Sequence, residues 1–473
     1  MWRFFKDFII YGFASILGKL MMVLLMPIYT SILTKEEYGA MALIFSCQGI
    51  IDLFSNLNLH SGIARDYYEN DTNRTKLISS GFYAILAISL SVVFVTLMGC
   101  KENIISYIGL RPSFILPLKI MVITTPFLCL TTYFSILTRF KKKPISFSLI
   151  TSIALIVQLS ISIAGVVYLR AGIISVFLGH LISSIITALL FGYINREYLA
   201  LAFEKKYVKK ALLFSLPTLP AILAGWLDTS VGQILIGKYV SVEELGVYSI
   251  AISLASIFTL ISTAFHNVWS PFLYENYKKE TFQNDLNKLF SIITCGLTCI
   301  TIVISMFSKE IILLLSNEGY LNASIYFPLL CIPMCLYLMF PFVSSGVSIS
   351  RDTKYIGISY VLGSVSNLLI LLILIRRLGV IAVPICLSVS RIVTYFTLYY
   401  VSKIKIGYYL NNYYILLLII SAIACFWAQL NDVGLVWRSI ASGISLFLII
   451  YNMSRKYKIS YSMFKMNNNT KMK

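Results

Sequence analysis

Two short stretches of the chain carry adjacent glutamates, the kind of carboxylate pair that acid and base catalysis uses. Glu36 and Glu37 lie in LTKEEYGAMA, and Glu243 and Glu244 lie in VSVEELGVYS. In each stretch a Thr or Ser stands three residues before the second Glu, and an apolar run follows. This spacing is typical of a capping box, in which the hydroxyl accepts a bond from the helix backbone and the Glu side chain bonds back to the cap residue. The pairs therefore predict two helix starts, and catalysis by them is not expected.

Four other charged residues lie in the middle of long apolar stretches: Lys19, Asp52, Asp228 and Arg391. A Lys, Arg or Asp at the centre of a membrane helix costs about 2.5 to 3.5 kcal/mol on insertion scales, so each is a functional candidate. Lys19 and Asp52 fall at equal depth on either side of the turn between their helices, and they would pair there. The alternatives for this pair are a structural salt bridge and a role in transport.

Asp228 is the strongest candidate for ion coupling. Its segment, 211–237, contains Pro217 and Pro220 and has glycines near the acid, which indicates the kind of discontinuous helix that forms ion sites in transporters. The alternative is a buried structural acid that pairs with Arg391 or Lys19.

Arg391 has no acidic residue one helical turn away, so its partner is another helix or an anionic ligand. The planar guanidinium group suits a phosphate. Arg65 and Arg139, at the inner ends of their helices, would guide an anionic headgroup into a cleft. Ordinary anchoring at the membrane surface is the alternative for these two.

These residues must be positioned by membrane helices. Of 473 residues, 58% are hydrophobic and 12% charged, and the mean hydropathy is +0.83. Soluble domains carry about 25% charged residues. Apolar stretches long enough to cross a bilayer recur about fourteen times. We therefore predict an all-α polytopic membrane protein, in which a water-soluble catalytic domain has no place.

The net charge of +19 is distributed unevenly. If the N-terminus is cytoplasmic, the connections on that side hold about 27 Lys and Arg and those on the other side about nine. Such an asymmetry orients membrane helices. It explains the positive net charge, so binding of nucleic acid is not needed to account for it. Both termini are predicted to be cytoplasmic, and anionic membrane lipids would attract the basic tail.

The two capped stretches also indicate an internal repeat. Thr34 to Ser46 matches Ser241 to Ser253 at constant spacing, and an even number of crossings lies between them. Parallel repeats of this kind form two lobes around a cleft. We predict an N-lobe over 1–200, a C-lobe over 201–405, two extra helices over 406–454 and a disordered cytoplasmic tail over 455–473.

Cysteine usage does not point to a metal site. The nine cysteines are scattered, and the pairs Cys295/Cys299 and Cys331/Cys335 lie one turn apart inside apolar runs. Metal sites would need histidines or carboxylates nearby, and the chain has only three histidines. We interpret the cysteines as small packing residues and expect neither a metal nor a cofactor.

Several motifs resemble a known family. YGFASILGKLMMVLLMPIYTSILTKEEYGAMALIFS, NLNLHSGIARDYYE and WLDTSVGQILIGKYVSVEELGVYSIA are similar to polysaccharide (O-antigen) flippases of the Wzx type. These belong to the superfamily that includes the MATE exporters and the lipid II flippases. The resemblance covers about residues 5–400. Members often carry a basic residue after the acid of the seventh helix, whereas this chain has Thr229 there.

The resemblance implies a transport function. The substrate would be an oligosaccharide repeat unit on undecaprenyl pyrophosphate, flipped across the bacterial plasma (inner) membrane by alternating access coupled to H+ or Na+. A polysaccharide polymerase and a chain-length regulator would be candidate partners. The candidate site residues follow: cavity cations Lys19, Arg65, Arg139 and Arg391, and coupling acids Asp228 and Asp52.

Two alternatives stay open. A membrane oligosaccharide polymerase or ligase would serve the same pathway, but such enzymes have a long external loop, and the external connections here are short. A MATE-type exporter of small molecules would more often have twelve helices and an acid-rich cavity in its N-lobe. We therefore expect a transporter and not an enzyme.

Overall fold

The computed structural model describes residues 21, 23–67, 73–407 and 409–457. These residues form helices and their connections, without a β-strand among them. Twelve helical segments are long and apolar enough to cross a membrane, and Val23–Ile32 is a shorter apolar helix. One of the twelve, Lys354–Ile406, contains two helices joined by a short 3₁₀ turn. The all-α polytopic membrane fold is therefore confirmed, while the number of about fourteen crossings stays a prediction.

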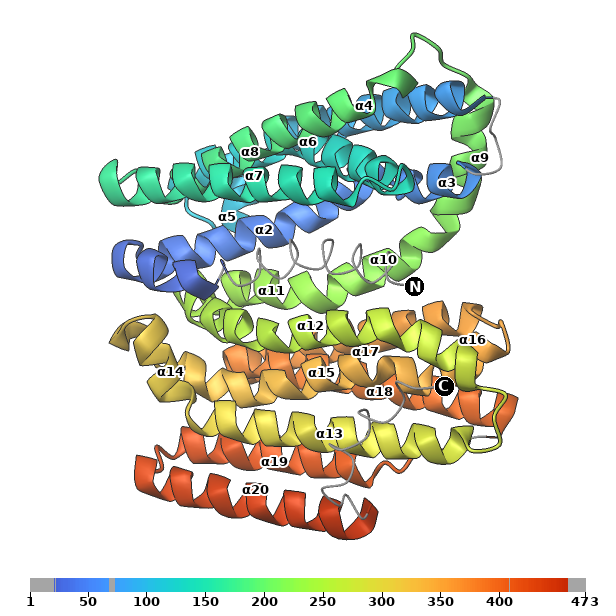
Figure 1. The fold of residues 1–473 in the computed structure, drawn as a ribbon. Coiled ribbons are helices and arrows are strands. Elements are labelled where there is room, and N and C mark those ends of the chain that lie inside the picture. Colours follow the sequence, from blue (N-terminus) through green and yellow to red (C-terminus); the bar gives the residue numbers. More distant parts are fainter. Residues whose placement is uncertain (1–20, 22, 68–72, 408, 458–473) are drawn as a thin grey trace.

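The helices form two bundles that lie one above the other in Figure 1. The N-terminal bundle has its own apolar core, which includes Ile63, Ile78, Tyr133 and Phe191. Its helices are α2 (Lys35–Asn56), α3 (Leu59–Asp66), α4 (Arg74–Gly99), α5 (Glu102–Tyr107), α6 (Ile115–Phe140), α7 (Pro144–Ile163) and α8 (Ile173–Ile194).

A broken helix follows the N-terminal bundle and lies between the two bundles (Figure 1). It consists of α9 (Lys205–Ser215), α10 (Leu219–Trp226) and α11 (Gly232–Tyr239). A 3₁₀ turn at Leu216–Thr218 and a π-helical turn at Leu227–Val231 separate these parts. The predicted discontinuity is therefore present, and its first interruption coincides with Pro217, whose nitrogen has no hydrogen to donate within a helix.

The C-terminal bundle follows. Its helices are α12 (Val242–Asn276), α13 (Phe282–Met306), α14 (Ser308–Leu315), α15 (Ala323–Val343), α16 (Ser345–Ile349), α17 (Lys354–Leu378), α18 (Ala382–Ile406), α19 (Tyr413–Leu430) and α20 (Leu435–Tyr457). Helices α19 and α20 lie on the side of α13 that faces away from the N-terminal bundle (Figure 1). Nη2 of Arg438, on α20, forms an ion pair with Oε1 of Glu310, on α14, at 2.7 Å.

The two glutamate pairs lie at helix starts, as predicted. Thr34 accepts a bond from the Glu37 amide at 3.1 Å, and the Glu37 carboxylate accepts one from the Thr34 amide at 2.9 Å. This capping box is confirmed. The second prediction is only half right: Ser241 caps α12, but Glu244 accepts a hydrogen bond from the Tyr326 hydroxyl at 3.1 Å. The Glu244 carboxylate therefore bonds to a residue far away in the chain, although the local spacing predicted a bond back to the cap residue.

The two capped helices also hold the bundles together. A Cβ atom on Gly39 would overlap the carbonyl oxygen of Val242, and one on Gly246 would overlap that of Lys35. Such close backbone approach requires glycine on both helices. The bundles are therefore in direct backbone contact where α2 and α12 begin, and we call this side of the molecule the capped end.

Candidate functional site

A cavity of about 750 Å³ lies in the C-terminal bundle beside the broken helix. Its walls come from the broken helix and from α12, α15, α17 and α18. Asn58 and Thr353 also line it, and they lie at helix ends opposite the capped end. The volume is in the usual range for pockets that hold small molecules, about 300 to 1,000 Å³.

Asp228 and Arg391 are the charged residues that line this cavity, and they face one another. Nη1 of Arg391 lies 3.3 Å from Oδ2 of Asp228, and the exposed fractions of the two side chains are 10% and 1%. Oδ1 of Asp228 accepts hydrogen bonds from Ser390 at 3.0 Å and Asn367 at 3.2 Å. The structure therefore places Arg391 as the partner of Asp228, one of the two roles that the sequence left open for each residue.

The hydrogen bonding of this pair is incomplete. Nη1 of Arg391 and Oδ2 of Asp228, the two atoms of the 3.3 Å ion pair, are buried, and neither makes a hydrogen bond of good geometry among the described residues. The guanidinium carbon lies 5.4 Å from the ring centre of Tyr337 and 5.8 Å from that of Phe340. Buried polar atoms are almost always hydrogen-bonded, so each exception needs an explanation. Arg391 is held in place by two rings and one carboxylate, and it lines the cavity.

The local backbone explains how Asp228 reaches this position. Asp228 is the second residue of the π-helical turn Leu227–Val231, and such turns occur often at functional sites. Ser364 of α17 donates to the Ala224 carbonyl at 2.8 Å, one turn before the acid. These contacts fix the broken helix against α17.

The helix that contains Asp52 begins and ends earlier than predicted. The sequence predicts one helix over 39–60, but α2 ends at Asn56, and Leu57 and Asn58 both take the left-handed conformation. This conformation is uncommon for residues other than glycine. Asn58 then donates to the Thr218 hydroxyl at 2.9 Å, so the break directs a polar group to the cavity wall.

Asp52 itself lies outside the cavity lining. Its carboxylate accepts a hydrogen bond at 2.7 Å from the Gln48 amide, which also donates to Thr125 at 2.9 Å. No cation among the described residues lies within ion-pair distance of Asp52. Lys19, the predicted partner, lies outside the described residues.

The structure does not bring the remaining predicted cations into the cavity lining. Arg65 on α3 is exposed and lies over the ring of Phe214, at 4.9 Å. Arg139 on α6 is also exposed and lies over Phe147, at 5.0 Å. Both are at the end of the molecule opposite the capped end, where an anchoring role and a guiding role are equally compatible with the contacts.

The sequence interpretation missed several residues of this site. Asn367 and Ser390 bond to Asp228, and Tyr337 lies under Arg391. An amide inside the apolar stretch 355–375 was a usable signal, because lipid does not tolerate an unpaired amide. Nothing local distinguishes Tyr337, since tyrosine is abundant in the chain.

Metal binding has no evident site in the described part of the chain. No group of three or more His, Cys, Asp or Glu side chains could hold an ion there. The nine cysteines are free, and six of them are buried.

Comparison with known proteins adds to this geometry. The chain is similar to "Lsg locus putative protein 1" of Haemophilus influenzae, with 21% identity over 71% of this chain and 82% of that protein. Its fold resembles that of "Lipid II flippase MurJ, inward closed conformation", with a TM-score of 0.75, 18% identity and coverage of 96% and 99% of the two chains. An inward-facing multidrug resistance MATE family transporter of the MOP superfamily gives a TM-score of 0.68 at 14% identity, over 84% of this chain and 94% of the other.

A family match covers most of the chain. Residues 28–325, which extend from the first helix to the start of α15, match the family described as "Polysaccharide biosynthesis protein". The shared fold with MurJ and with a MATE transporter agrees with the superfamily that the sequence motifs suggested. This chain therefore belongs to the polysaccharide biosynthesis protein family and has the fold of the MOP superfamily.

Proposed function

We propose that this protein is a flippase for an undecaprenyl-pyrophosphate-linked oligosaccharide, the repeat unit of an O-antigen or a similar surface polysaccharide. It would move this lipid from the cytoplasmic to the outer leaflet of a bacterial inner membrane, with both termini in the cytoplasm. The observation that carries the proposal is the cavity of about 750 Å³ whose lining includes the Asp228–Arg391 ion pair. The family match and the MurJ-like fold support it.

The physical problem in flipping is the polar headgroup. Sugars and pyrophosphate cannot enter hydrocarbon without losing hydrogen bonds, whereas the lipid tail can stay in the bilayer. A polar cavity beside the bilayer gives the headgroup a path. The capped end would face outward, because the connections at the opposite end hold most of the positive charge. Asn58 and Thr353 would then lie at the cytoplasmic end of the cavity.

The Asp228–Arg391 pair would link ion movement to substrate binding. Pyrophosphate competes with Asp228 for the guanidinium donors, and a proton or Na+ on Asp228 weakens its hold on Arg391. Each elementary charge moved across the membrane is worth about 2.3 kcal/mol per 100 mV, which can drive the cycle. In this mechanism the protein binds, releases and reorients its substrate without making or breaking covalent bonds, so it is not an enzyme.

Reconstitution tests the proposal directly. Liposomes that contain the purified protein should expose labelled undecaprenyl-pyrophosphate oligosaccharide to an impermeant glycosidase faster than liposomes with the same lipid but without the protein. A cationic dye in place of the lipid tests the exporter alternative. Dye transport without exposure of the labelled lipid would contradict the flippase function.

A further inference from the structure

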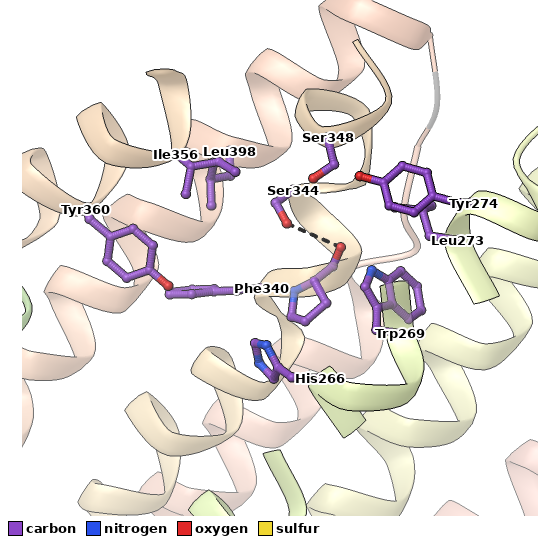
Figure 2. A pocket seen from close by; sticks show the side chains of 11 residues that line it. His266, Trp269, Leu273, Tyr274, Phe340, Ser344, Ser348, Ile356, Tyr360 and Leu398 are labelled. Carbon is purple, nitrogen blue, oxygen red and sulfur yellow. Dashed lines mark hydrogen bonds between the residues drawn. The ribbon is translucent and has the colours of Figure 1, made fainter. Parts of the chain in front are cut away.

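A second pocket, drawn in Figure 2, lies next to the main cavity. It has a volume of about 180 Å³ and lies between the end of α12 and helices α15 to α18. Ile356 and Tyr360 line both this pocket and the main cavity, so the two are neighbours. We call it the side pocket.

Five of the eleven residues that line the side pocket have aromatic rings. His266, Trp269 and Phe340 form part of the lining, and Tyr360 meets Phe340 edge to face at 5.6 Å between ring centres. Trp269 is fixed by its contact with Phe342, at 4.3 Å. These rings are held by the apolar core, and the pocket is therefore preformed.

Polar groups lie among the rings. Ser344, Ser348 and Tyr274 contribute hydroxyls, and those of Ser348 and Tyr274 point toward one another in Figure 2. Nε2 of His266 is buried and has no hydrogen-bond partner among the described residues. Pockets of this composition bind amphipathic molecules, in which apolar faces pack on rings and a few polar groups fix the orientation.

The side pocket is linked to the charged pair through Tyr337 and Phe340. The Tyr337 ring stacks on His266, with 5.6 Å between ring centres and 22° between planes. The Arg391 guanidinium carbon lies 5.4 Å from the ring centre of Tyr337 and 5.8 Å from that of Phe340, which lines the side pocket. A ligand with its anionic group at Arg391 would therefore have its next chemical unit close to the side pocket.

We infer that the side pocket binds one sugar ring of the lipid-linked oligosaccharide. The inference rests on the proposed function and adds a site for the sugar. A dry apolar cavity of about 150 Å³ holds one benzene ring, so the side pocket has the size of a single six-membered ring. An isoprenoid unit would leave the buried Nε2 of His266 without a partner, which is costly. A sugar ring has apolar faces for Phe340 and Trp269 and hydroxyls for the polar groups.

Binding of two lipids tests this inference. The probes are undecaprenyl pyrophosphate without sugar and the same lipid bearing one hexose or one N-acetylhexosamine. The intact protein in nanodiscs should bind a sugar-bearing lipid about tenfold more tightly than the bare lipid, the factor that about 1.4 kcal/mol of interaction gives. His266→Ala and Ser348→Leu should remove this preference and retain binding of the bare lipid.

The control is Ser91→Leu, on the exposed face of α4, where the hydroxyl bonds only to its own helix at Ala87. It should keep the preference. Equal binding of all lipids by the intact protein, or an unchanged preference in His266→Ala and Ser348→Leu, overturns the side pocket as a sugar site while leaving the flippase proposal in place. Failure of the intact protein to bind any of the lipids contradicts the proposed function itself.

Discussion

Asp52 in the N-terminal bundle and Asp228 in the broken helix are both acids inside apolar helices, and their surroundings differ. Asp228 faces Arg391, is bonded by Ser390 and Asn367 and lines the cavity. Asp52 accepts a hydrogen bond from the Gln48 amide and does not line the cavity. The charge at the candidate site therefore lies on the broken helix and on α18, and Asp52 of the N-terminal bundle is not part of it.

The largest expected effect comes from removing one member of the charged pair. Removing one partner of a buried ion pair costs about 3 to 5 kcal/mol, because the other charge stays buried. We expect Arg391→Ala and Asp228→Asn to abolish polymer display at the cell surface while the protein still inserts. Display is measured with a polymer-specific antibody, and insertion by membrane fractionation.

A double variant separates stability from function in this pair. Asp228→Asn combined with Arg391→Gln removes both charges of this pair. The thermal unfolding temperature of the double variant should therefore recover toward that of the unsubstituted protein. Display should stay absent, because the anion-binding group is gone. Normal display in both single variants would show that the pair has no role in transport.

The next largest effect concerns the contact that the bundles share at the capped end. Gly246→Leu places a side chain where the Lys35 carbonyl lies, and overpacking typically costs about 1 to 3 kcal/mol. We expect a lower unfolding temperature and reduced display. Gly443→Leu is the matched control, since its Cβ would meet nothing within 4 Å. Equal behaviour of the two variants would refute a role for close backbone contact.

Asp52→Asn should have a smaller effect than Asp228→Asn. An amide at this position can still accept a hydrogen bond from Gln48, and no ion pair among the described residues is broken. We expect stable protein with display reduced but present, and a flipping rate in liposomes that depends less on the ion gradient. Complete loss of display would make the two acids equivalent and remove the distinction between the bundles.

The smallest effect is expected for Arg65→Ala and Arg139→Ala. Each arginine is exposed and lies over one ring, a contact worth about 0.5 to 1 kcal/mol at exposed sites. The flipping rate at saturating lipid should be unchanged. The lipid concentration that gives half of this rate should rise by less than about tenfold. A loss of the maximal rate as large as that of Arg391→Ala would instead place these residues in the transport path.

Several elements of the fold could be predicted because their causes are local. The Thr34 box depends on residues within one helical turn, and Pro217, which has no backbone N–H to donate, lies at the interruption of its own helix. The break at Leu57 and Asn58 was not predictable in this way, since neither residue favours the left-handed conformation enough to mark it. The hydrogen bond from Asn58 to Thr218 is one tertiary contact at this break.

The sequence predicted the two charged residues of the candidate site, but not how the residues of the site are arranged in space. Asp228 and Arg391 stood out because charge inside an apolar segment is costly in any membrane fold. Their pairing, the Asn367 and Ser390 bonds and the side pocket depend on how α15, α17 and α18 are rotated against the broken helix. Helix rotation is set by packing across the whole bundle, which no local pattern contains.

The sequence by itself determined that this is a helical membrane protein, where its capped helices begin and which charges would need a partner. These properties follow from hydropathy, residue spacing and the cost of burying charge, which act within single segments. Only the tertiary structure decided that Glu244 bonds to Tyr326, that Gly39 meets α12 and that Asp228 faces Arg391. Each of these contacts joins segments far apart in the chain, and packing alone brings them together.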